Sequence, residues 1–183
     1  MMKSIVAVMT AILFCRPTMP QAIAAADAKI VVERSAKLGI DPLLVVANVD
    51  RESRWQEWAI NPKSGARGLG QVLPEYRPQC VGSASKSAAC AEEKKKLLDG
   101  AYNLGVAIDA LGAWQVFCKK KTGYWSEESI LQAYQGLNVP KTNVWCGATV
   151  VSGKWTPTKL PAITRAVMQR RRALRLRLEA MGS

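Results

Sequence analysis

The sequence predicts a single, mostly α-helical domain with irregular, disulfide-stapled loops. Apolar residues recur at helical spacing in several segments, and capping residues stand where those segments begin and end. Gly, Pro and Ser gather in stretches that also contain cysteines, which is typical of loops held by covalent links. The chain has 183 residues, so one compact core is possible and two independent ones are not.

The first 26 residues have the layout of a cleaved secretory signal. Lys3 precedes an apolar run over residues 5–14, and small residues cluster at positions 22–26. The run is too short for a comfortable membrane span, which makes a retained anchor the weaker alternative. We therefore expect residues 1–26 to be removed and residues 27–183 to form an exported domain, periplasmic or secreted.

The chain is strongly basic. Lys and Arg number 26 against 14 Asp and Glu, which gives a formal net charge of +12. Such a charge attracts polyanions, including cell-wall polymers, anionic lipid head groups and nucleic acid. Export makes nucleic acid the weakest of these partners, so we expect no specific nucleic-acid binding.

Several classes of active site are excluded by residue type. The chain has no histidine, which rules out Ser-His-Asp and Cys-His catalysis and histidine metal sites. It also lacks a phosphate-binding loop and the dinucleotide fingerprint. We expect no metal and no cofactor, and a carboxylate is the best remaining candidate for a catalytic group.

Four cysteines follow the signal, at positions Cys80, Cys90, Cys118 and Cys146. In an exported chain they indicate two disulfides, for which three connectivities are possible. We favour Cys80 with Cys90 and Cys118 with Cys146, because these pairs join neighbours in sequence and would hold the two least helical stretches. No C-x-x-C motif occurs, which argues against zinc.

The first helices of the exported part are predicted from their ends. Residues 28–38 form a short amphipathic pattern that stops at Gly39. Asp41 is suited to cap the next helix, and Pro42 fits its first position without losing a hydrogen bond.

Glu52 is the candidate catalytic acid on this second helix. It lies on the same stripe as Val45 and Val49, at i+7 and i+3 from them. Burial beside apolar residues raises the pKa of a carboxyl, which is what a general acid near neutral pH needs. The competing interpretation is that Glu52 only ends a helix at the surface.

The residues after Glu52 carry a family resemblance. Ser53-Arg54-Trp55 follow it, then Asn61-Pro62, and then the loop Gly65-Ala66-Arg67-Gly68-Leu69-Gly70-Gln71 with Pro74 behind it. This order resembles the soluble lytic transglycosylase family, which has a goose-type-lysozyme-like fold, a Glu-Ser pair at a helix end and a Gly-Leu-Met-Gln turn. The resemblance implies that Glu52 is catalytic and that Ser53 and Gln71 hold polar groups of the substrate. Gly70 stands where the family has Met, so an apolar contact to the sugar is missing.

Two later helices extend the resemblance. We expect Asp99 to cap a helix that resembles the family's Asn-Leu-x-x-Gly-x-x-Tyr-Leu segment, with Asn103 in place and Ala107 at the glycine position. Ser126 is suited to cap the next helix, which ends in Ala133-Tyr134-Gln135-Gly136 and resembles the family's Ala-Tyr-Asn-x-Gly signature. The resemblance implies that Tyr134 orients the acid and that Gln135 offers an amide to the substrate. Tyr134 as an aromatic core residue is the alternative.

The remaining segments are less specific. Residues 75–91 read as a loop or broken helix, and residues 137–160 as irregular or short-stranded, with Trp145 and Trp155 unassigned. Residues 162–181 form a basic amphipathic helix. It either docks on a membrane surface or on an envelope or secretion-system protein, or it is a packed helix with a solvated face.

The resemblance covers about residues 39–168 and implies a lysozyme-like domain acting on peptidoglycan glycan strands. Glu52 would cleave the β-1,4 bond between N-acetylmuramic acid and N-acetylglucosamine and leave a 1,6-anhydro product. Retaining hydrolases with a protein nucleophile need a second carboxylate about 5 Å away, and Asp50 faces another side of the helix. The alternatives are a hydrolytic lysozyme of the same fold, or a wall-binding secretion or conjugation accessory whose catalysis is secondary or lost. We expect a monomer.

Overall fold

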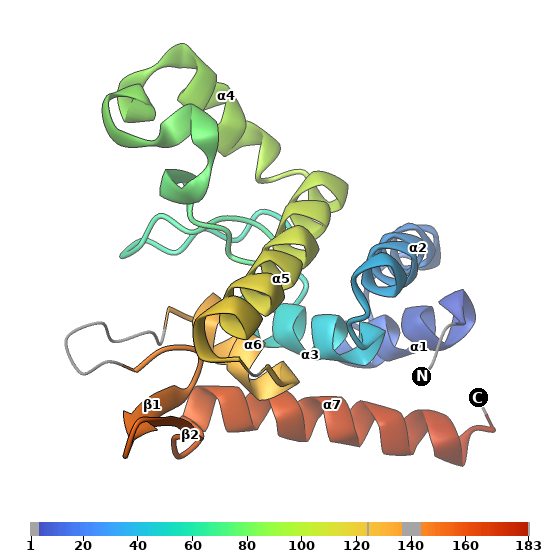
Figure 1. Cartoon of the computed structure of the whole chain (residues 1–183). Helices are drawn as coiled ribbons and strands as arrows, with labels where there is room; N and C mark the ends of the chain where they lie inside the picture. Colours follow the sequence, from blue (N-terminus) through green and yellow to red (C-terminus); the bar gives the residue numbers. More distant parts are fainter. Residues whose placement is uncertain (1–3, 124, 137–143, 183) are drawn as a thin grey trace.

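A computed structural model of the chain describes residues 4–123, 125–136 and 144–182. The described part is mostly helical, with one small antiparallel hairpin (Figure 1). In chain order the elements are α1 (Ile5–Cys15), α2 (Gln21–Leu38), α3 (Pro42–Ser53), η1 (Pro74–Tyr76), η2 (Pro78–Cys80), η3 (Gly82–Lys86), α4 (Ala88–Lys96), α5 (Gly100–Thr122), α6 (Glu127–Tyr134), β1 (Ala148–Val151), β2 (Lys154–Pro157) and α7 (Ala162–Ala180).

Helix α3 is the centre of the fold. Every side chain from Leu43 to Val49 is buried, which follows from an apolar sequence on all faces of the helix. Helices α1, α2 and α7 pack directly against α3, and α5 joins this core through α2 and α6. The one polar side chain inside this run is Asn48. The last turn of α3, which carries Glu52, is thus fixed on a rigid element.

The predicted helix ends are confirmed by their capping bonds. The Asp41 carboxylate accepts a hydrogen bond from the Leu43 amide at 3.1 Å, with Pro42 at the first helical position. Asp99 accepts from the Tyr102 amide at 2.8 Å at the start of α5. Gly39 ends α2 with a left-handed φ of 68°, as glycine does most easily.

Residues 4–26 contain α1, a short connection and the beginning of α2. Ala7, Val8, Ala11 and Ile12 are buried where α1 packs against α2, α3 and α7. Helix α2 begins at Gln21, earlier than the predicted position 28, because the alanines between them continue the helix. The removal of residues 1–26 as a secretory signal stays a prediction. Among the described residues, no helix combines the length and the apolar character that crossing a membrane requires.

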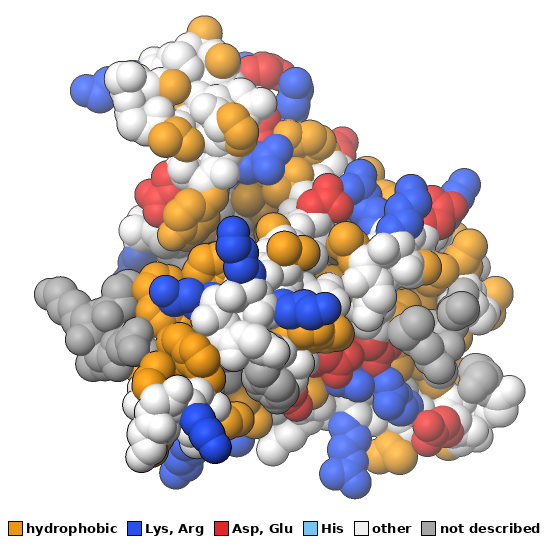
Figure 2. Space-filling view, viewed as in Figure 1, with side chains coloured by type: hydrophobic (Ala, Val, Ile, Leu, Met, Phe, Trp, Pro, Cys, Tyr) orange, Lys and Arg blue, Asp and Glu red, His pale blue; other side chains and the backbone are white. Residues whose placement is uncertain are grey.

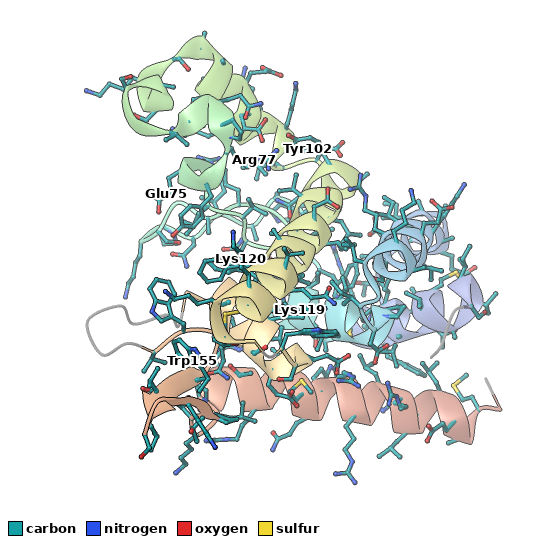
Figure 3. All side chains as sticks on the ribbon, viewed as in Figure 1. Glu75, Arg77, Tyr102, Lys119, Lys120 and Trp155 are labelled. Atoms are coloured by element: carbon teal, nitrogen blue, oxygen red, sulfur yellow. A yellow bond between two sulfur atoms is a disulfide. The ribbon has the colours of Figure 1, made fainter. Side chains whose placement is uncertain are left out.

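Residues 74–96, here called the lobe, project from the body of the molecule (Figures 1 and 2). Three short 3-10 helices and α4 pack on one another, and the Cys80–Cys90 disulfide joins them. The buried Glu93 carboxylate accepts from the Arg77 guanidinium at 2.8 Å and from the Tyr102 hydroxyl at 2.8 Å. Arg77 and Tyr102 meet where the lobe joins α5 (Figure 3).

The second disulfide, Cys118–Cys146, links α5 to the turn before β1. Both cysteine pairings are the predicted ones. Strands β1 and β2 form an antiparallel hairpin in which Ala148 pairs with Pro157, in agreement with a short-stranded segment. Residues 137–143 of that segment lie outside the described residues. Two disulfides are typical of proteins that fold in an oxidising compartment outside the cytosol.

Helix α7 packs along α3, and some of its arginines form ion pairs with acidic residues of the same chain. Arg170 pairs with Asp50 at 2.7 Å, and Arg171 and Arg175 pair with Asp41 at 2.9 and 2.6 Å. These contacts favour the interpretation of a packed helix for its inner face. Docking of the outer face on a partner stays a prediction.

Candidate active site

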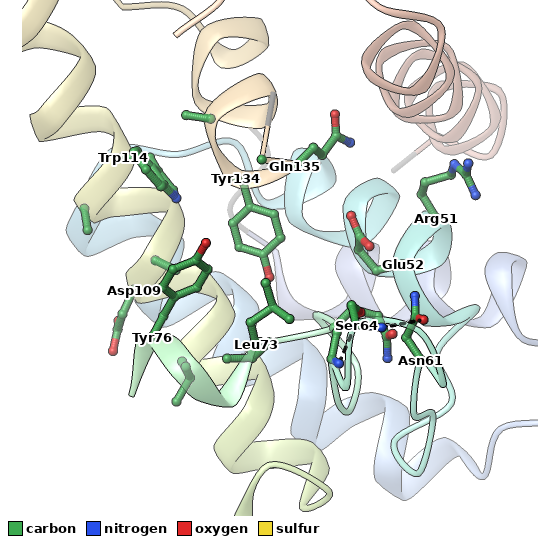
Figure 4. A pocket seen from close by; sticks show the side chains of 18 of the residues that line it. Arg51, Glu52, Asn61, Ser64, Leu73, Tyr76, Asp109, Trp114, Tyr134 and Gln135 are labelled. Carbon is green, nitrogen blue, oxygen red and sulfur yellow. Dashed lines mark hydrogen bonds between the residues drawn. The ribbon is translucent and has the colours of Figure 1, made fainter. Parts of the chain in front are cut away.

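A cavity of about 1010 Å³ lies where the end of α3, the glycine-rich loop, α5 and α6 meet (Figure 4). Four of the sequence-predicted site residues line it: Glu52, Gln71, Tyr134 and Gln135. They come from three separate parts of the chain. The fifth, Ser53, is not in the lining.

Glu52 stands in the last turn of α3, and a sharp turn follows it. Arg54 and Trp55 both take left-handed backbone angles, with φ of 53° and 60°, so the chain leaves the helix at once. Burial raises the pKa of the Glu52 carboxyl to about 7, and the neighbouring Arg51 opposes this only in part. No described residue donates a hydrogen bond to the carboxylate. It is therefore suited to exchange a proton near neutral pH.

The glycine-rich loop is held on α5 by the buried amide of Asn103. Its Nδ2 donates to the carbonyls of Arg67 and Leu97, each at 2.8 Å, and its Oδ1 accepts from the Gly70 amide at 2.7 Å. Gly68 has a φ of 71°, and a Cβ there would lie 2.2 Å from the Leu97 carbonyl oxygen. Only glycine fits so close an approach of two backbones.

Gly70 and Ala107 explain one departure from the family pattern. A Cβ on Gly70 would lie 2.3 Å from the Ala107 Cβ and 2.8 Å from the Tyr134 hydroxyl oxygen. The resemblance puts Met at position 70 and Gly at position 107. In this chain Ala107 places a methyl group on helix α5, so position 70 in the loop must be glycine.

Tyr134 ties the loop to α6. Its hydroxyl donates to the Gly70 carbonyl at 2.6 Å. Burial, followed by the negative charge of Glu52, raises the pKa of this hydroxyl well above its usual range, so it stays protonated. The proton of Tyr134 thus goes to Gly70 and holds the loop opposite Glu52. That Tyr134 also orients the acid stays a prediction.

Two further expectations about the motif change. The Ser53 hydroxyl turns back along α3 and donates to the Val49 carbonyl at 3.3 Å, a common bond for a serine in a helix, so it does not reach the cavity. The Gln71 amide nitrogen donates to the carbonyls of Ala59 and Gly68 at 3.2 and 3.1 Å. The amide oxygen is thus the atom that Gln71 can offer to a ligand.

Gln135 offers the complementary group. Its amide oxygen accepts from the Thr164 hydroxyl at 2.9 Å. Its amide nitrogen is buried and has no hydrogen-bond partner among the described residues. A buried donor without a partner is costly, and a carbonyl or hydroxyl of a bound ligand would satisfy it.

One other carboxylate reaches the cavity lining. Asp109 lies on α5 and pairs with Arg34 at 2.6 Å. Asp50 is on another face of α3, bound to Arg170. Within the described part of the chain, Glu52 is therefore the only carboxylate of the lining without an ion-pair partner.

Sequence reasoning missed part of the lining and the role of Asn103. An amide on a helix face that otherwise carries Leu104, Ala107, Ile108 and Leu111 is itself a signal, because a buried amide must find partners. Arg51, Asn61, Tyr76 and Trp114 also line the cavity, and no local pattern distinguishes them from ordinary surface residues.

Comparison of the chain with protein-family models, with curated proteins and with solved structures gave no match.

Proposed function

We propose that this protein is a lytic transglycosylase that cleaves the β-1,4 bond between N-acetylmuramic acid and N-acetylglucosamine in peptidoglycan. One observation carries the proposal: Glu52, with its pKa raised to about 7, is the only unpaired carboxylate that the described residues bring to a cavity of about 1010 Å³. The sequence resemblance supplies the substrate class. The strong positive charge is consistent with an anionic wall polymer.

The proposed reaction uses Glu52 twice. The protonated carboxyl donates its proton to the glycosidic oxygen, and the bond from that oxygen to C1 of the muramic sugar breaks. The resulting carboxylate then takes the proton of the C6 hydroxyl, whose oxygen bonds to C1 and closes the 1,6-anhydro ring. The carboxyl ends in its starting state, and no water is consumed. A pKa near 7 suits both steps, because the proton must leave and return at similar cost.

Among the described residues, the cavity lining holds no second unpaired carboxylate, which favours this route over a protein nucleophile. The substrate's own N-acetyl group is the natural stabiliser of positive charge at C1. Gln71 and Gln135 supply an acceptor and a donor suited to amide and hydroxyl groups of the sugars. The disulfides fit an exported enzyme, which would open the wall locally, for example around an envelope-spanning machine.

The test is digestion of purified peptidoglycan with product analysis by mass spectrometry. Glu52→Gln is expected to lose on the order of 10²- to 10⁴-fold in rate, as expected for removal of acid-base catalysis. Asp109→Asn is the matched control, since it alters the other carboxylate of the lining and should keep most of the activity. Anhydro products support the transglycosylase and reducing ends support a lysozyme. Equal rates for wild type and Glu52→Gln would refute the assignment.

A further inference from the structure

An aromatic cluster forms the end of the cavity away from Glu52. Trp114 on α5 and Trp145 before β1 both line the cavity, and Phe117 lies between them. The ring centroids of Trp114 and Phe117 are 5.4 Å apart, and those of Phe117 and Trp145 are 5.8 Å apart. Figure 4 shows Trp114 and Tyr76 at one end of the cavity, Glu52 at the other, and Tyr134 between them.

These rings differ from a core tryptophan in this same protein. Trp55 is 0% exposed and fills the core, whereas Trp114 and Trp145 keep part of their surface on the cavity. Tyr76, which lies at the same end of the cavity as Trp114 (Figure 4), is 72% exposed. An aromatic ring that leaves apolar surface open on a cavity indicates a binding site better than a fully buried ring does. A ligand can still cover that surface and gain from removing it from water.

The backbone under Trp145 is held from several sides. The Cys118–Cys146 disulfide ties the next residue to α5. The Gly147 carbonyl accepts from the Thr158 amide at 2.7 Å, and Gly147 approaches the buried Gln132 so closely that a Cβ would lie 2.1 Å from its amide nitrogen. A rigid ring loses little entropy when a ligand binds, which favours affinity.

Two neighbouring side chains, Lys121 and Phe117, also orient the Trp145 ring. The Lys121 ammonium lies 5.1 Å from the ring centroid, and Phe117 packs at a tilt of 50°. With these contacts and the fixed backbone, the indole is pre-oriented where it lines the cavity. A flat, fixed apolar surface beside polar groups is a suitable binding site for the C–H face of a pyranose ring.

We infer that Trp114 and Trp145 form a sugar platform that binds a β-1,4-linked N-acetylhexosamine chain at a distance from the cleaved bond. The inference rests on the proposed function for the identity of the glycan chain. It adds that the protein recognises a stretch of substrate longer than the two sugars at the cleaved bond. A cavity of about 1010 Å³ is at the upper end for a drug-sized ligand, so it has room for several sugar rings. Chains that reach both Glu52 and the platform bind more tightly than those that reach one.

The test measures binding without turnover. Glu52→Gln protein is titrated with the N-acetylglucosamine pentamer by isothermal calorimetry, first alone and then with Trp145→Ala added. Loss of one aromatic contact is expected to weaken pentamer binding about three- to tenfold. Trp155→Ala is the matched control, because Trp155 lies on β2 outside the cavity lining, and it should leave the affinity unchanged.

Trp145→Leu guards against a folding defect, which near-ultraviolet circular dichroism would reveal. Leucine keeps apolar contact with Phe117 but offers no flat face, so the same loss of affinity is expected. Unchanged pentamer affinity in the folded Trp145 variants, or no pentamer binding by Glu52→Gln protein, would overturn the platform. If Trp145 variants bind less tightly while wild type releases no anhydro product, the platform stands and the proposed reaction fails.

Discussion

Replacing Glu52 with glutamine should stabilise the protein above neutral pH while removing the proposed activity. Burial raises the pKa of the Glu52 carboxyl from 4.5 to about 7 in the folded chain. Between these values the folded state holds more protons than the unfolded state, so the free energy of unfolding falls as pH rises. Below pH 4.5 the carboxyl is neutral in both states and costs little. Above pH 7 the wild type carries the full cost of a desolvated charge, and glutamine does not.

The magnitude follows from the same shift. A rise in pKa from 4.5 to about 7 corresponds to an upper limit of roughly 3.5 kcal/mol, at about 1.4 kcal/mol per pKa unit. The Glu52 side chain keeps some contact with solvent, so we reduce this to about 1–2 kcal/mol. For a chain of this size, that is about 2–8 °C in Tm.

Thermal unfolding of wild type and Glu52→Gln at pH 4 and pH 8.5 checks this expectation. Asp27 is also buried with a raised pKa of about 6, but it is present in both proteins and cancels in the difference. Asp50→Asn is the matched control on the same helix, and it should destabilise by about 1 kcal/mol or more because it breaks a partly buried ion pair with Arg170. A Glu52→Gln variant that gains nothing at pH 8.5, or gains equally at both pH values, would refute the reasoning.

Three further changes test the packing around the site. Gly70→Ala should cost about 1–3 kcal/mol in unfolding free energy by overpacking against Ala107, and adding Ala107→Gly should restore much of it in a double-mutant cycle. Asn103→Ala should cost about 2–4 kcal/mol in thermal or urea unfolding and speed hydrogen exchange in the glycine-rich loop, since three backbone groups lose their partner. A chain of residues 27–183 should unfold at a lower temperature than the full chain, because losing α1 uncovers apolar surface; equal Tm values in calorimetry would contradict this.

Local signals predicted the capped starts of α3 and α5. Asp41 and Asp99 cap helices through bonds that span two or three residues, and short-range chemistry of this kind is visible in sequence. Glu52 could be picked out because its spacing from two valines follows from helix geometry alone. Its burial was one of two interpretations that the sequence left open, and the central position of α3 decides between them.

Side-chain partners distant in sequence could not be predicted. The Tyr134 hydroxyl bonds to a carbonyl 64 residues away, and Asn103 reaches the loop across 33 to 36 residues. A family resemblance predicts that such residues lie close together, but it does not predict which atom accepts each hydrogen bond. The residues of α1 show a different limit, because an apolar run of this length suits a secretory signal and a packed helix equally.

The basic helix α7 is tied to α3 by long-range ion pairs of this kind. Arg170 pairs with Asp50 near the end of α3, and Arg171 pairs with Asp41 at its start. The adjacent Arg51 lowers the pKa of the Glu52 carboxyl, but by less than burial raises it. The arginines of α7, bound to other carboxylates, are therefore not among the causes of the Glu52 shift, and its pKa of about 7 follows mainly from burial.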